Sequence, residues 1–292
     1  MDMPVTRAVI LAAGLGTRML PATKSVPKEM LPIVDRPLIQ YAVEEAVEAG
    51  ITDIVFVIAD GKESVRDHFS LGGRVEQLVR AKGDTSLDAL VTAPAGLARF
   101  HYVHQDEPRG PGHAVLCARE LVEGEPFVLM FPDDLILGPS CTAELVAAYG
   151  RSGGSIVAVE RVPRDEISQY GIVAPAGEGT PIPLKDLVEK PPLAEAPSDL
   201  AIVGRYVLTP SILRHIEHAP AGKGGEKYVT EALQGQIAAG EGVFASTYSG
   251  DRFDTGRPAG YIAACVAAAL RRPDLGEQVR ARVSSILEGV SR

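Results

Sequence analysis

Short apolar runs alternate with stretches of helical spacing through the first half of the chain. The runs that we expect to form buried strands are residues 8–13, 54–58, 100–103, 127–131 and 155–159. Helical spacing separates them, at residues 38–49, 64–93 and 114–121, and Gly83 divides the longest of these segments. This alternation predicts an α/β fold with a Rossmann-like, mostly parallel (mixed) sheet that carries helices on both faces.

The pattern changes near Val162, where frequent prolines separate short β-like runs. Residues 171–173, 187–188 and 201–208 are expected to be antiparallel strands of a smaller β-rich lobe. A helix is predicted at residues 228–239, and a mostly helical C-terminal tail is expected to pack on the lobe or on another subunit. We therefore expect a single domain, residues 1–292, with halves at 1–161 and 162–256 and the tail at 257–292.

Charge and composition exclude several classes of partner. The chain has 292 residues and a formal net charge of -9, so neither nucleic acid nor an anionic membrane surface is an expected partner. No N-terminal signal is visible, and the longest later apolar stretch, residues 259–270, is too short to span a bilayer. The three cysteines are widely spaced, which favours the reducing cytoplasm over a disulfide framework or a metal cluster.

The first apolar run ends in a glycine turn, Gly14-Leu15-Gly16-Thr17-Arg18. Glycines at a strand end leave backbone N–H groups uncovered, which suits phosphates or a flat base. Arg18 and Lys28 add two cations to this segment. An ordered loop rather than a helix is expected up to residue 32, because prolines recur at positions 21, 27 and 32.

Two familiar nucleotide-binding loops are excluded at this turn. A dinucleotide fingerprint would need a third glycine where Met19 stands, and a P-loop would need Gly-Lys-Ser/Thr where Gly16 precedes Thr17 and Arg18. Gly-x-Gly alone would favour an ordinary turn, but the nearby cations make that interpretation weaker.

Acidic residues follow two of the predicted strands. Asp133 and Asp134 come after the run at 127–131, and Asp254 follows a short strand far along the chain. Carboxylates placed in this way suit Mg²⁺ bound with a nucleotide, although a helix N-cap or a solvated turn explains the first pair equally well.

Other polar positions are ambiguous from the residues alone. Gln105 offers an amide suited to the edge of a pyrimidine, but a surface position is the simpler interpretation. Glu189 and Lys190 form what is usually a solvated turn before a proline. A helix face that includes residues 44, 45 and 48, all glutamates, is expected to be exposed.

Residues 12–50, AAGLGTRMLPATKSVPKEMLPIVDRPLIQYAVEEAVEAG, resemble the signature of the sugar nucleotidyltransferases, the sugar-phosphate pyrophosphorylases. The segment PATKSVPKEMLP is similar to the corresponding segment in the uridylyl branch of that family. The resemblance extends to about Gly260 and is weakest at residues 70–99 and in the tail.

The resemblance implies a cytoplasmic enzyme that transfers a uridylyl group from UTP to glucose 1-phosphate, giving UDP-glucose and pyrophosphate with Mg²⁺ as cofactor. It also suggests a homodimer or homotetramer. Use of dTTP, or of another hexose 1-phosphate, is the nearest alternative. A catalytically silent regulator and a nicotinamide oxidoreductase are more distant ones.

The same resemblance assigns roles to individual residues. The catalytic cations would be Arg18, Lys28 and Lys190, and the metal ligands Asp133 and Asp254. The nucleotide would be bound by Ala12, Ala13, Gly14, Gly16, Glu29, Gln105, Gly110, Gly112 and Asp134. The sugar would be bound by Gly171, Glu189, Val203 and Gly204. The chain departs from the family at Arg109 and Pro111, which does not obviously destroy the nucleotide site. It also departs at Thr255 and residues 225–231, which makes sugar specificity harder to infer than nucleotide class.

Overall fold

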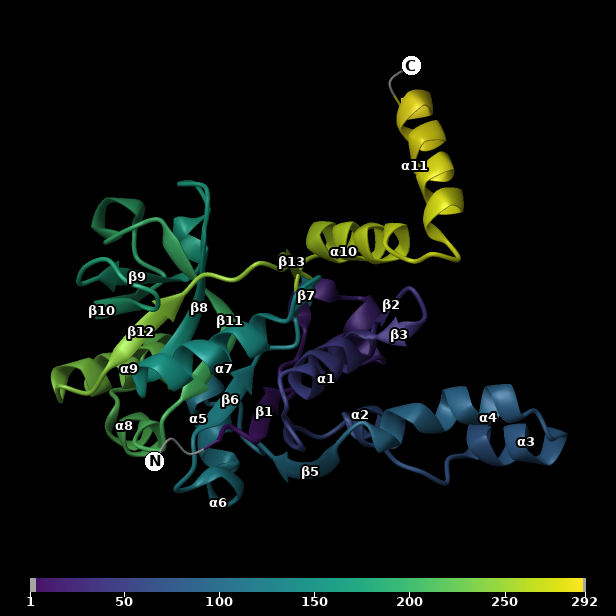
Figure 1. Cartoon of the computed structure of the whole chain (residues 1–292), viewed down its shortest axis with the longest axis horizontal. Coiled ribbons are helices and arrows are strands. Elements are labelled where there is room, and N and C mark those ends of the chain that lie inside the picture. The colour runs from purple at the N-terminus through teal and green to yellow at the C-terminus, as the bar shows by residue number, and fades with distance from the viewer. Residues whose placement is uncertain (1–3, 291–292) are drawn as a thin grey trace.

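The computed structural model describes residues 4–290, and a nine-stranded mixed sheet runs through its centre (Figure 1). The strand order is β5-β4-β1-β6-β11-β8-β12-β10-β9. These strands are β1 (Arg7–Leu11), β4 (Asp53–Ile58), β5 (Arg99–His104), β6 (Phe127–Met130), β8 (Ser155–Arg161), β9 (Gly171–Pro175), β10 (Ile182–Glu189), β11 (Leu200–Leu208) and β12 (Val243–Ser246). The pairs among β5, β4, β1 and β6 are parallel, as the alternating pattern predicts.

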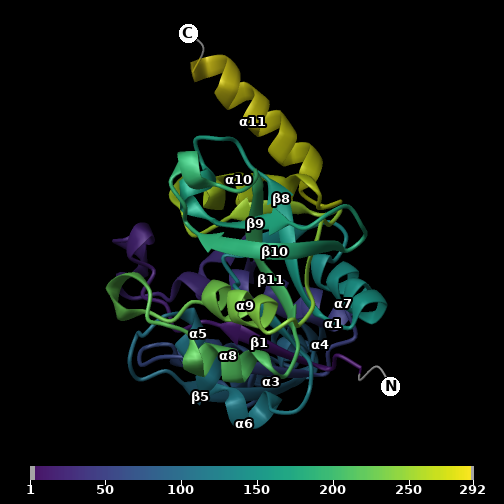
Figure 2. The same ribbon diagram turned by 90° about the vertical axis from the view of Figure 1, so that its left-hand side faces the viewer.

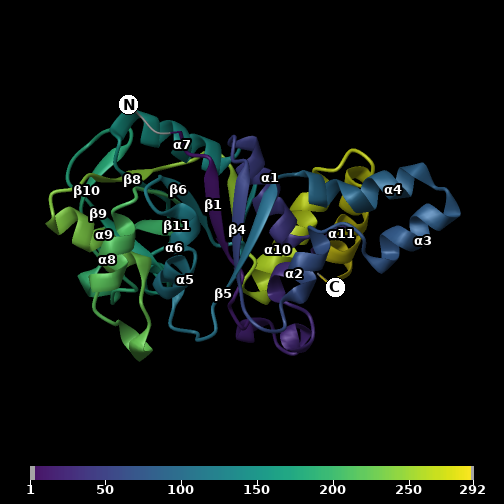
Figure 3. The same ribbon diagram turned by 90° about the horizontal axis from the view of Figure 1, so that it is seen from below.

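Helices cover both faces of the sheet, which confirms the predicted fold class (Figures 2 and 3). One face packs on α5 (Pro111–Cys117), α8 (Ile212–His218) and α9 (Val229–Ala238), and the other on α1 (Leu38–Glu48), α2 (Glu63–His68) and α7 (Cys141–Ser152). The short helix α6 (Arg119–Val122) follows α5. Each face buries its own cluster of aliphatic side chains, so burial of apolar area on both sides fixes the sheet in the middle.

The helical segment at 64–93 is divided at Gly83, as the sequence predicts, and also at residues 69–73, which separate α2 from the next helix and were not predicted to do so. Helix α3 (Arg74–Lys82) ends at Gly83, whose φ of 72° is the left-handed conformation that favours glycine. Asp84 then caps α4 (Thr85–Thr92), because its carboxylate accepts a hydrogen bond from the Leu87 amide at 3.0 Å. The two helices form an arm that projects from the body (Figures 1 and 3).

The sheet continues across the boundary predicted near residue 161. Strand β11 was expected in the smaller lobe, but it lies between β6 and β8 and is antiparallel to both. The antiparallel pair β9 and β10 forms the edge of the sheet. The two halves of the chain therefore share one sheet.

Two small two-stranded sheets stand outside the main sheet. Strand β7 (Asp134–Leu137) pairs with β13 (Asp251–Asp254) in an antiparallel register that sets Asp254 opposite Asp134. Strands β2 (Pro32–Ile33) and β3 (Arg36–Pro37) form the other, a hairpin. The β7–β13 pairing joins residues that lie more than a hundred positions apart, directly beside the predicted acidic cluster.

The tail forms α10 (Pro258–Leu270) and α11 (Gly276–Val290). Ala264 and Ala268 of α10 pack against Ile33, Leu38 and Leu135, so this helix lies on the first half of the chain and not on the smaller lobe. Helix α11 extends away from the body (Figure 1). Within residues 4–290, no helix combines the length and apolar character that crossing a membrane requires.

Candidate active site

The glycine turn after β1 forms a tight loop that packs on Lys28. Gly16 adopts a φ of 67°, and a Cβ at this position would lie 3.2 Å from Lys28 Cβ. Thr23 donates its hydroxyl to the Gly16 carbonyl at 2.8 Å. Ala12 continues the strand by donating its amide to the Val57 carbonyl at 2.8 Å. The loop is therefore ordered, as the prolines predict, and contains three short 3₁₀ turns, at Thr17–Met19, Ala22–Lys24 and Lys28–Met30.

Lys62 is a buried cation beneath this loop that the sequence analysis did not identify. Its ammonium donates to the Gly14 carbonyl at 2.8 Å and to the Glu29 carboxylate at 2.7 Å. Glu29 is completely buried, and its other oxygen, Oε1, has no hydrogen-bond partner. Burial raises the pKa of the Glu29 carboxyl in spite of Lys28 and Lys62. Lys62 follows β4 without a recognisable motif, so only the fold reveals its role.

Lys28 and Asp133 form an ion pair at the centre of the site. Lys28 Nζ lies 2.7 Å from Asp133 Oδ2, and both side chains are largely buried. Burial alone would lower the pKa of Lys28, but the Asp133 and Glu29 carboxylates outweigh it and raise that pKa. Burial would raise the pKa of Asp133, but Lys28 outweighs it and lowers that pKa. Both groups are therefore held in their charged forms.

Asp254 lies beside Asp133, as the sequence analysis expects. The Thr255 amide and hydroxyl both donate to the Asp133 carbonyl, each at 2.8 Å. A Cβ at Gly256 would lie 3.0 Å from Asp254 Oδ1 and 3.1 Å from Asp133 Oδ2. That Cβ position also lies 2.8 Å from Arg18 Nη2, and Arg18 Nη2 lies 3.9 Å from Asp133 Oδ2. Two carboxylates and a half-exposed arginine thus converge around Gly256.

Asp134 has a different environment from Asp133. Its Oδ2 accepts the Gly204 amide at 2.9 Å, and its Oδ1 accepts a hydrogen bond from Arg252 Nε at 2.5 Å. Arg252 also donates to Glu160 at 2.6 Å. Burial raises the pKa of Asp134 in spite of the neighbouring arginine. Asp134 therefore links β7, β11 and β13, and it lines the cavity described below.

Gln105 is buried and holds the loop before α5. Its Nε2 donates to the Gly110 carbonyl at 3.1 Å and lies 3.1 Å from His113 Nδ1. Gly110 has a φ of 88°, and a Cβ there would lie 2.7 Å from the Lys227 carbonyl oxygen. Glycine is therefore required at position 110 for two reasons: its φ is positive, and the backbone of Lys227 packs too closely to leave room for a Cβ.

The loop at 109–112 is joined to the segment before α9 by two backbone hydrogen bonds. The Gly112 amide donates to the Lys227 carbonyl at 2.7 Å, and the Lys227 amide donates to the Arg109 carbonyl at 2.9 Å. Lys227 in turn donates its ammonium to three carbonyls at the end of α8. We call this connection the 109–227 bridge.

A cavity of about 340 Å³ lies between the acidic turn and the edge of the sheet. Its lining includes Asp134, Gly171, Glu189, Lys190 and Gly204. The two glycines keep it open, because a Cβ at residue 171 would lie 3.2 Å from Glu189 Oε2, and one at residue 204 would lie 2.6 Å from Asp134 Oδ2. Val203 is adjacent in sequence, but its side chain belongs to the buried core, and the lining of this cavity does not include it.

Lys190 and Glu189 are held in place inside this cavity. Lys190 has a φ of 45°, which is unusual for a residue other than glycine, and its ammonium lies 3.0 Å from Glu189 Oε1. It also lies 5.6 Å from the centre of the Tyr228 ring. Thr230 donates its hydroxyl to the second Glu189 oxygen at 2.7 Å. Thr230 is a further residue that the sequence analysis did not identify.

One expectation for α1 is wrong. Glu45 was expected on an exposed face with residues 44 and 48, but it is buried and accepts hydrogen bonds from Arg205 in β11. The reason is that α7 and β11 close over this face, and Thr142 at the start of α7 also donates to Glu45, at 2.7 Å. The partner of Glu45 lies 160 residues away, so no local pattern indicates it.

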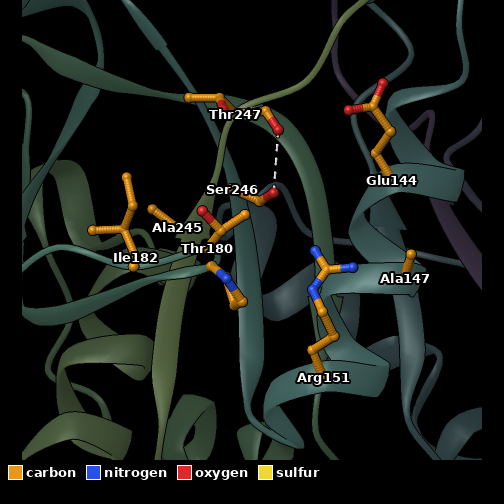
Figure 4. Close-up of a pocket in the computed structure, with 10 residues that line it drawn as sticks. Glu144, Ala147, Arg151, Thr180, Ile182, Ala245, Ser246 and Thr247 are labelled. Atoms are coloured by element: carbon orange, nitrogen blue, oxygen red, sulfur yellow. Dashed lines mark hydrogen bonds between the residues drawn. The ribbon is translucent and has the colours of Figure 1, made fainter.

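Two further hollows among the described residues are lined by none of the predicted site residues. One of about 400 Å³ lies where Glu144 and Arg151 of α7 face Ala245, Ser246 and Thr247 (Figure 4). A larger one, about 1040 Å³, lies between the α3–α4 arm and the loop at residues 30–40. Among residues 4–290, no group of three or more His, Cys, Asp or Glu side chains is arranged to hold a metal ion.

A glycine loop, buried lysines and neighbouring carboxylates at the strand ends of an α/β sheet are typical of proteins that handle nucleotides and their phosphates. The model of the family "Nucleotidyl transferase" matches residues 7–269. The chain belongs to this family.

Relatives and solved structures agree with that placement. The UTP–glucose-1-phosphate uridylyltransferase of Bacillus subtilis strain 168 is 44% identical over 94% of both chains. The enzyme of that name from Streptococcus pneumoniae serotype 4 is 43% identical over 96% of this chain and 95% of its own.

Two solved structures share the fold over most of their length. A UDP-glucose pyrophosphorylase complexed with UDP-glucose has a TM-score of 0.82 and 38% identity over 92% of this chain and all of its own. A UTP-bound UGPase from Acinetobacter baumannii has a TM-score of 0.86 and 36% identity over 96% of this chain and 98% of its own.

Proposed function

We propose that this protein transfers the uridylyl group of UTP to α-D-glucose 1-phosphate, giving UDP-glucose and releasing pyrophosphate. The observation that carries the proposal is the convergence of Lys28, Arg18, Asp133 and Asp254 beside the glycine loop. Relatives at 38–44% identity have this activity as their name, and one solved relative is described as bound to UTP. The rest of the mechanism follows from the placement of the side chains.

The main chemical obstacle is repulsion between two anions. The sugar phosphate is already ionised at neutral pH, so it attacks the α-phosphorus of UTP without a general base. The protein must align the attack and neutralise charge. Arg18 is half-exposed next to the glycine loop, where it can neutralise the leaving pyrophosphate. Lys28 is held charged by Asp133 and can exchange this partner for the α-phosphate or the leaving phosphates.

The nucleotide binds along the glycine loop and the 109–112 loop in this proposal. The backbone of residues 12–16, with Gly14 and Gly16, approaches the phosphates and the base, and Glu29 lies beneath it with a free buried acceptor. Gln105 orders Gly110 and presents its amide to the edge of the uracil. Asp134 lies where it can contact the ribose or support its neighbours.

Asp133 and Asp254 would hold Mg²⁺ together with the substrate phosphates. The donor set fits a hard cation, since both are carboxylates that converge around Gly256. When bound, Mg²⁺ supplies charge neutralisation and Lewis acidity at the phosphate oxygens. Arg18 and Lys28 supply the remaining positive charge from the chain itself.

The sugar phosphate occupies the cavity around Lys190. Lys190 neutralises and aims the phosphate, and its strained φ supports a functional role, because such conformations persist where the surroundings hold them. Glu189 accepts hydrogen bonds from sugar hydroxyls. Gly171, Gly204 and the backbone of Val203 border the space for the hexose ring.

A pyrophosphate-release assay tests the proposal. Purified protein is offered UTP, dTTP, CTP or ATP with glucose, galactose or mannose 1-phosphate, in the presence of Mg²⁺ or a chelator. We expect turnover to be highest with UTP and glucose 1-phosphate, and lost with the chelator. Faster turnover with dTTP or another hexose would assign a different nucleotidyltransferase. No turnover with any pair would contradict enzymatic function.

We also propose that the protein is a cytoplasmic homodimer or homotetramer. Ile262 and Ile286 on the tail helices are more than half exposed, as is Leu90 on the α3–α4 arm. The tail and the arm project on the same side of the molecule (Figure 3). The free cysteines suit a reducing compartment. Light scattering coupled to size-exclusion chromatography tests the assembly, and a monomer at micromolar concentration would contradict it.

A further inference from the structure

Arg205 is a fully buried cation in the middle of the sheet. It lies in β11, it is 1% exposed, and the nearest carboxylate is Glu45 of α1, with Arg205 Nη2 2.8 Å from Glu45 Oε2. Arg205 Nε lies 3.2 and 3.1 Å from the two Glu45 oxygens. The mechanism proposed above does not use either residue.

The remaining donors of Arg205 contact the turn that carries Asp133. Nη1 donates to the Phe131 carbonyl at 2.8 Å, and Nη2 donates to the Asp134 carbonyl at 2.8 Å. Nη1 also donates to the Gly204 carbonyl at 3.0 Å. All five N–H groups of a guanidinium are thus used, and one planar group joins both ends of the turn at 131–134. A lysine could not make this set of bonds, because its ammonium is a compact point charge with three donors.

The position of this turn decides where Asp133 points. The Asp133 carbonyl receives two hydrogen bonds from Thr255, and its carboxylate meets Lys28. Arg205 holds the carbonyls of Phe131 and Asp134, the two ends of the turn that contains Asp133. Glu45 in turn holds Arg205 in place. Glu45 is itself held by the Thr142 amide at 3.0 Å and the Thr142 hydroxyl at 2.7 Å. The chain of contacts therefore runs from α7 through α1 and β11 to the acidic turn.

Stability alone is a weak explanation for such a pair. Replacing a buried ion pair by apolar side chains of similar volume is often neutral or stabilising, whereas removing one partner is costly. The geometry points to a positioning function instead. We infer that Arg205, fixed by Glu45, is a positioning residue that sets the turn at 131–134 and so aims the Asp133 carboxylate at Lys28 and at the substrate phosphates.

Two Arg205 variants and one control test this inference. Arg205→Lys keeps the charge but loses the planar fork, and Arg205→Met removes both. Val207→Ala is the matched control, because Val207 lies on the same strand and is equally buried but makes no bond to the turn. Thermal unfolding of all three variants identifies a temperature at which each is folded.

The first measurement is hydrogen exchange at the Asp134 and Thr255 amides, which bond to the Phe131 and Asp133 carbonyls. We expect these amides to exchange about tenfold faster in Arg205→Lys than in Val207→Ala, because the turn loses its anchor. Unchanged protection in Arg205→Lys would overturn the inference. This measurement needs no substrate, so it decides the inference even if the proposed function fails. If Arg205→Met does not fold, the exchange rates measured in Arg205→Lys alone still decide the inference.

The second measurement is steady-state kinetics, which rests on the proposed function. We expect kcat of Arg205→Lys to fall on the order of a hundredfold, with KM for UTP changed less than about threefold, because the reacting groups are misaligned and not lost. Val207→Ala should keep its kcat. An equal fall of kcat in Val207→Ala, or a normal kcat in Arg205→Lys, would reduce Arg205 to a structural role. Failure of the wild type to turn over would contradict the proposed function and not this inference.

Discussion

The Lys28 ammonium lies 2.7 Å from Asp133 Oδ2, which ties the loop after β1 to the turn after β6. These two segments are adjacent because β1 and β6 are neighbouring parallel strands whose carboxyl ends meet at one edge of the sheet. The Lys28–Asp133 ion pair therefore places a positive charge beside a carboxylate before any substrate binds.

Replacing Lys28 by Met should destabilise the fold in a pH-dependent manner. The lowered pKa of Asp133 contributes stability above its usual value of 3.8, and the raised pKa of Lys28 contributes stability below its usual value of 10.5. The difference in unfolding free energy between wild type and Lys28→Met should therefore be largest between these values, about 3 kcal/mol near neutrality. It should shrink as the pH falls below 3.8 or rises above 10.5.

Denaturant unfolding at a series of pH values measures this difference. Lys24→Met is a control, because Lys24 is an exposed lysine in the same loop. A constant difference across the whole pH range would show that Lys28 stabilises by packing and not by charge.

Asp254→Asn should remove most of the activity and leave the fold intact. The side chain keeps its size but loses the charge that would help to hold Mg²⁺, so kcat should fall about 10²- to 10³-fold. The measurement is turnover as a function of Mg²⁺ concentration, together with the thermal midpoint. Asp251→Asn, on the same strand but exposed, should behave like wild type. Full activity in Asp254→Asn would refute its assignment as a metal ligand.

Lys190→Ala should affect the sugar phosphate more than the nucleotide. Lys190 lines the cavity with Glu189 and Tyr228, and its ammonium contacts both of these residues. Loss of a charge-assisted hydrogen bond predicts a rise of about 10- to 100-fold in KM for glucose 1-phosphate. Lys185→Ala removes an exposed lysine from β10, the strand that ends just before Lys190, and serves as the control. Equal losses for both substrates would argue against the proposed role.

Gln105→Ala should weaken discrimination between pyrimidine nucleotides. The amide orders the Gly110 carbonyl, and in the proposal it also contacts the base. We expect the preference for UTP over CTP and dTTP, expressed as the ratio of kcat/KM values, to fall about tenfold. Gln77→Ala, on the distant arm, controls for the loss of a glutamine amide. An unchanged ratio would transfer base recognition to the backbone of the loop.

The sequence predicted the elements well because their signals are local. Gly83 ends α3 and Asp84 caps α4, and both features follow from the intrinsic conformational preferences of glycine and aspartate. Asp133 could be noticed from its place after β6, whereas Asp254 was paired with it only through the family resemblance. The insertion of β11 between β6 and β8 could not be predicted, since it depends on pairing between strands some 70 residues apart.

Long-range polar partners were the least predictable part of the site. Glu45 belongs to a helix face that includes exposed glutamates, and only the approach of Arg205 from β11 explains its burial. Lys62 is similar, because its two acceptors come from the loop at residues 14–29. Such buried charges follow from the tertiary fold, since each needs a partner of opposite charge or a carbonyl from another element.

The 109–227 bridge has a consequence for the order of events during turnover. Gly112 belongs to the loop that the proposed function places against the nucleotide, and Tyr228, the residue after Lys227, lines the cavity that it places around the sugar phosphate. A movement of either segment must carry the other with it or break two backbone hydrogen bonds. Under the proposed function, binding of one substrate would therefore alter the shape of the site that the other meets. By reciprocity, each ligand would then change the affinity for the other by the same factor.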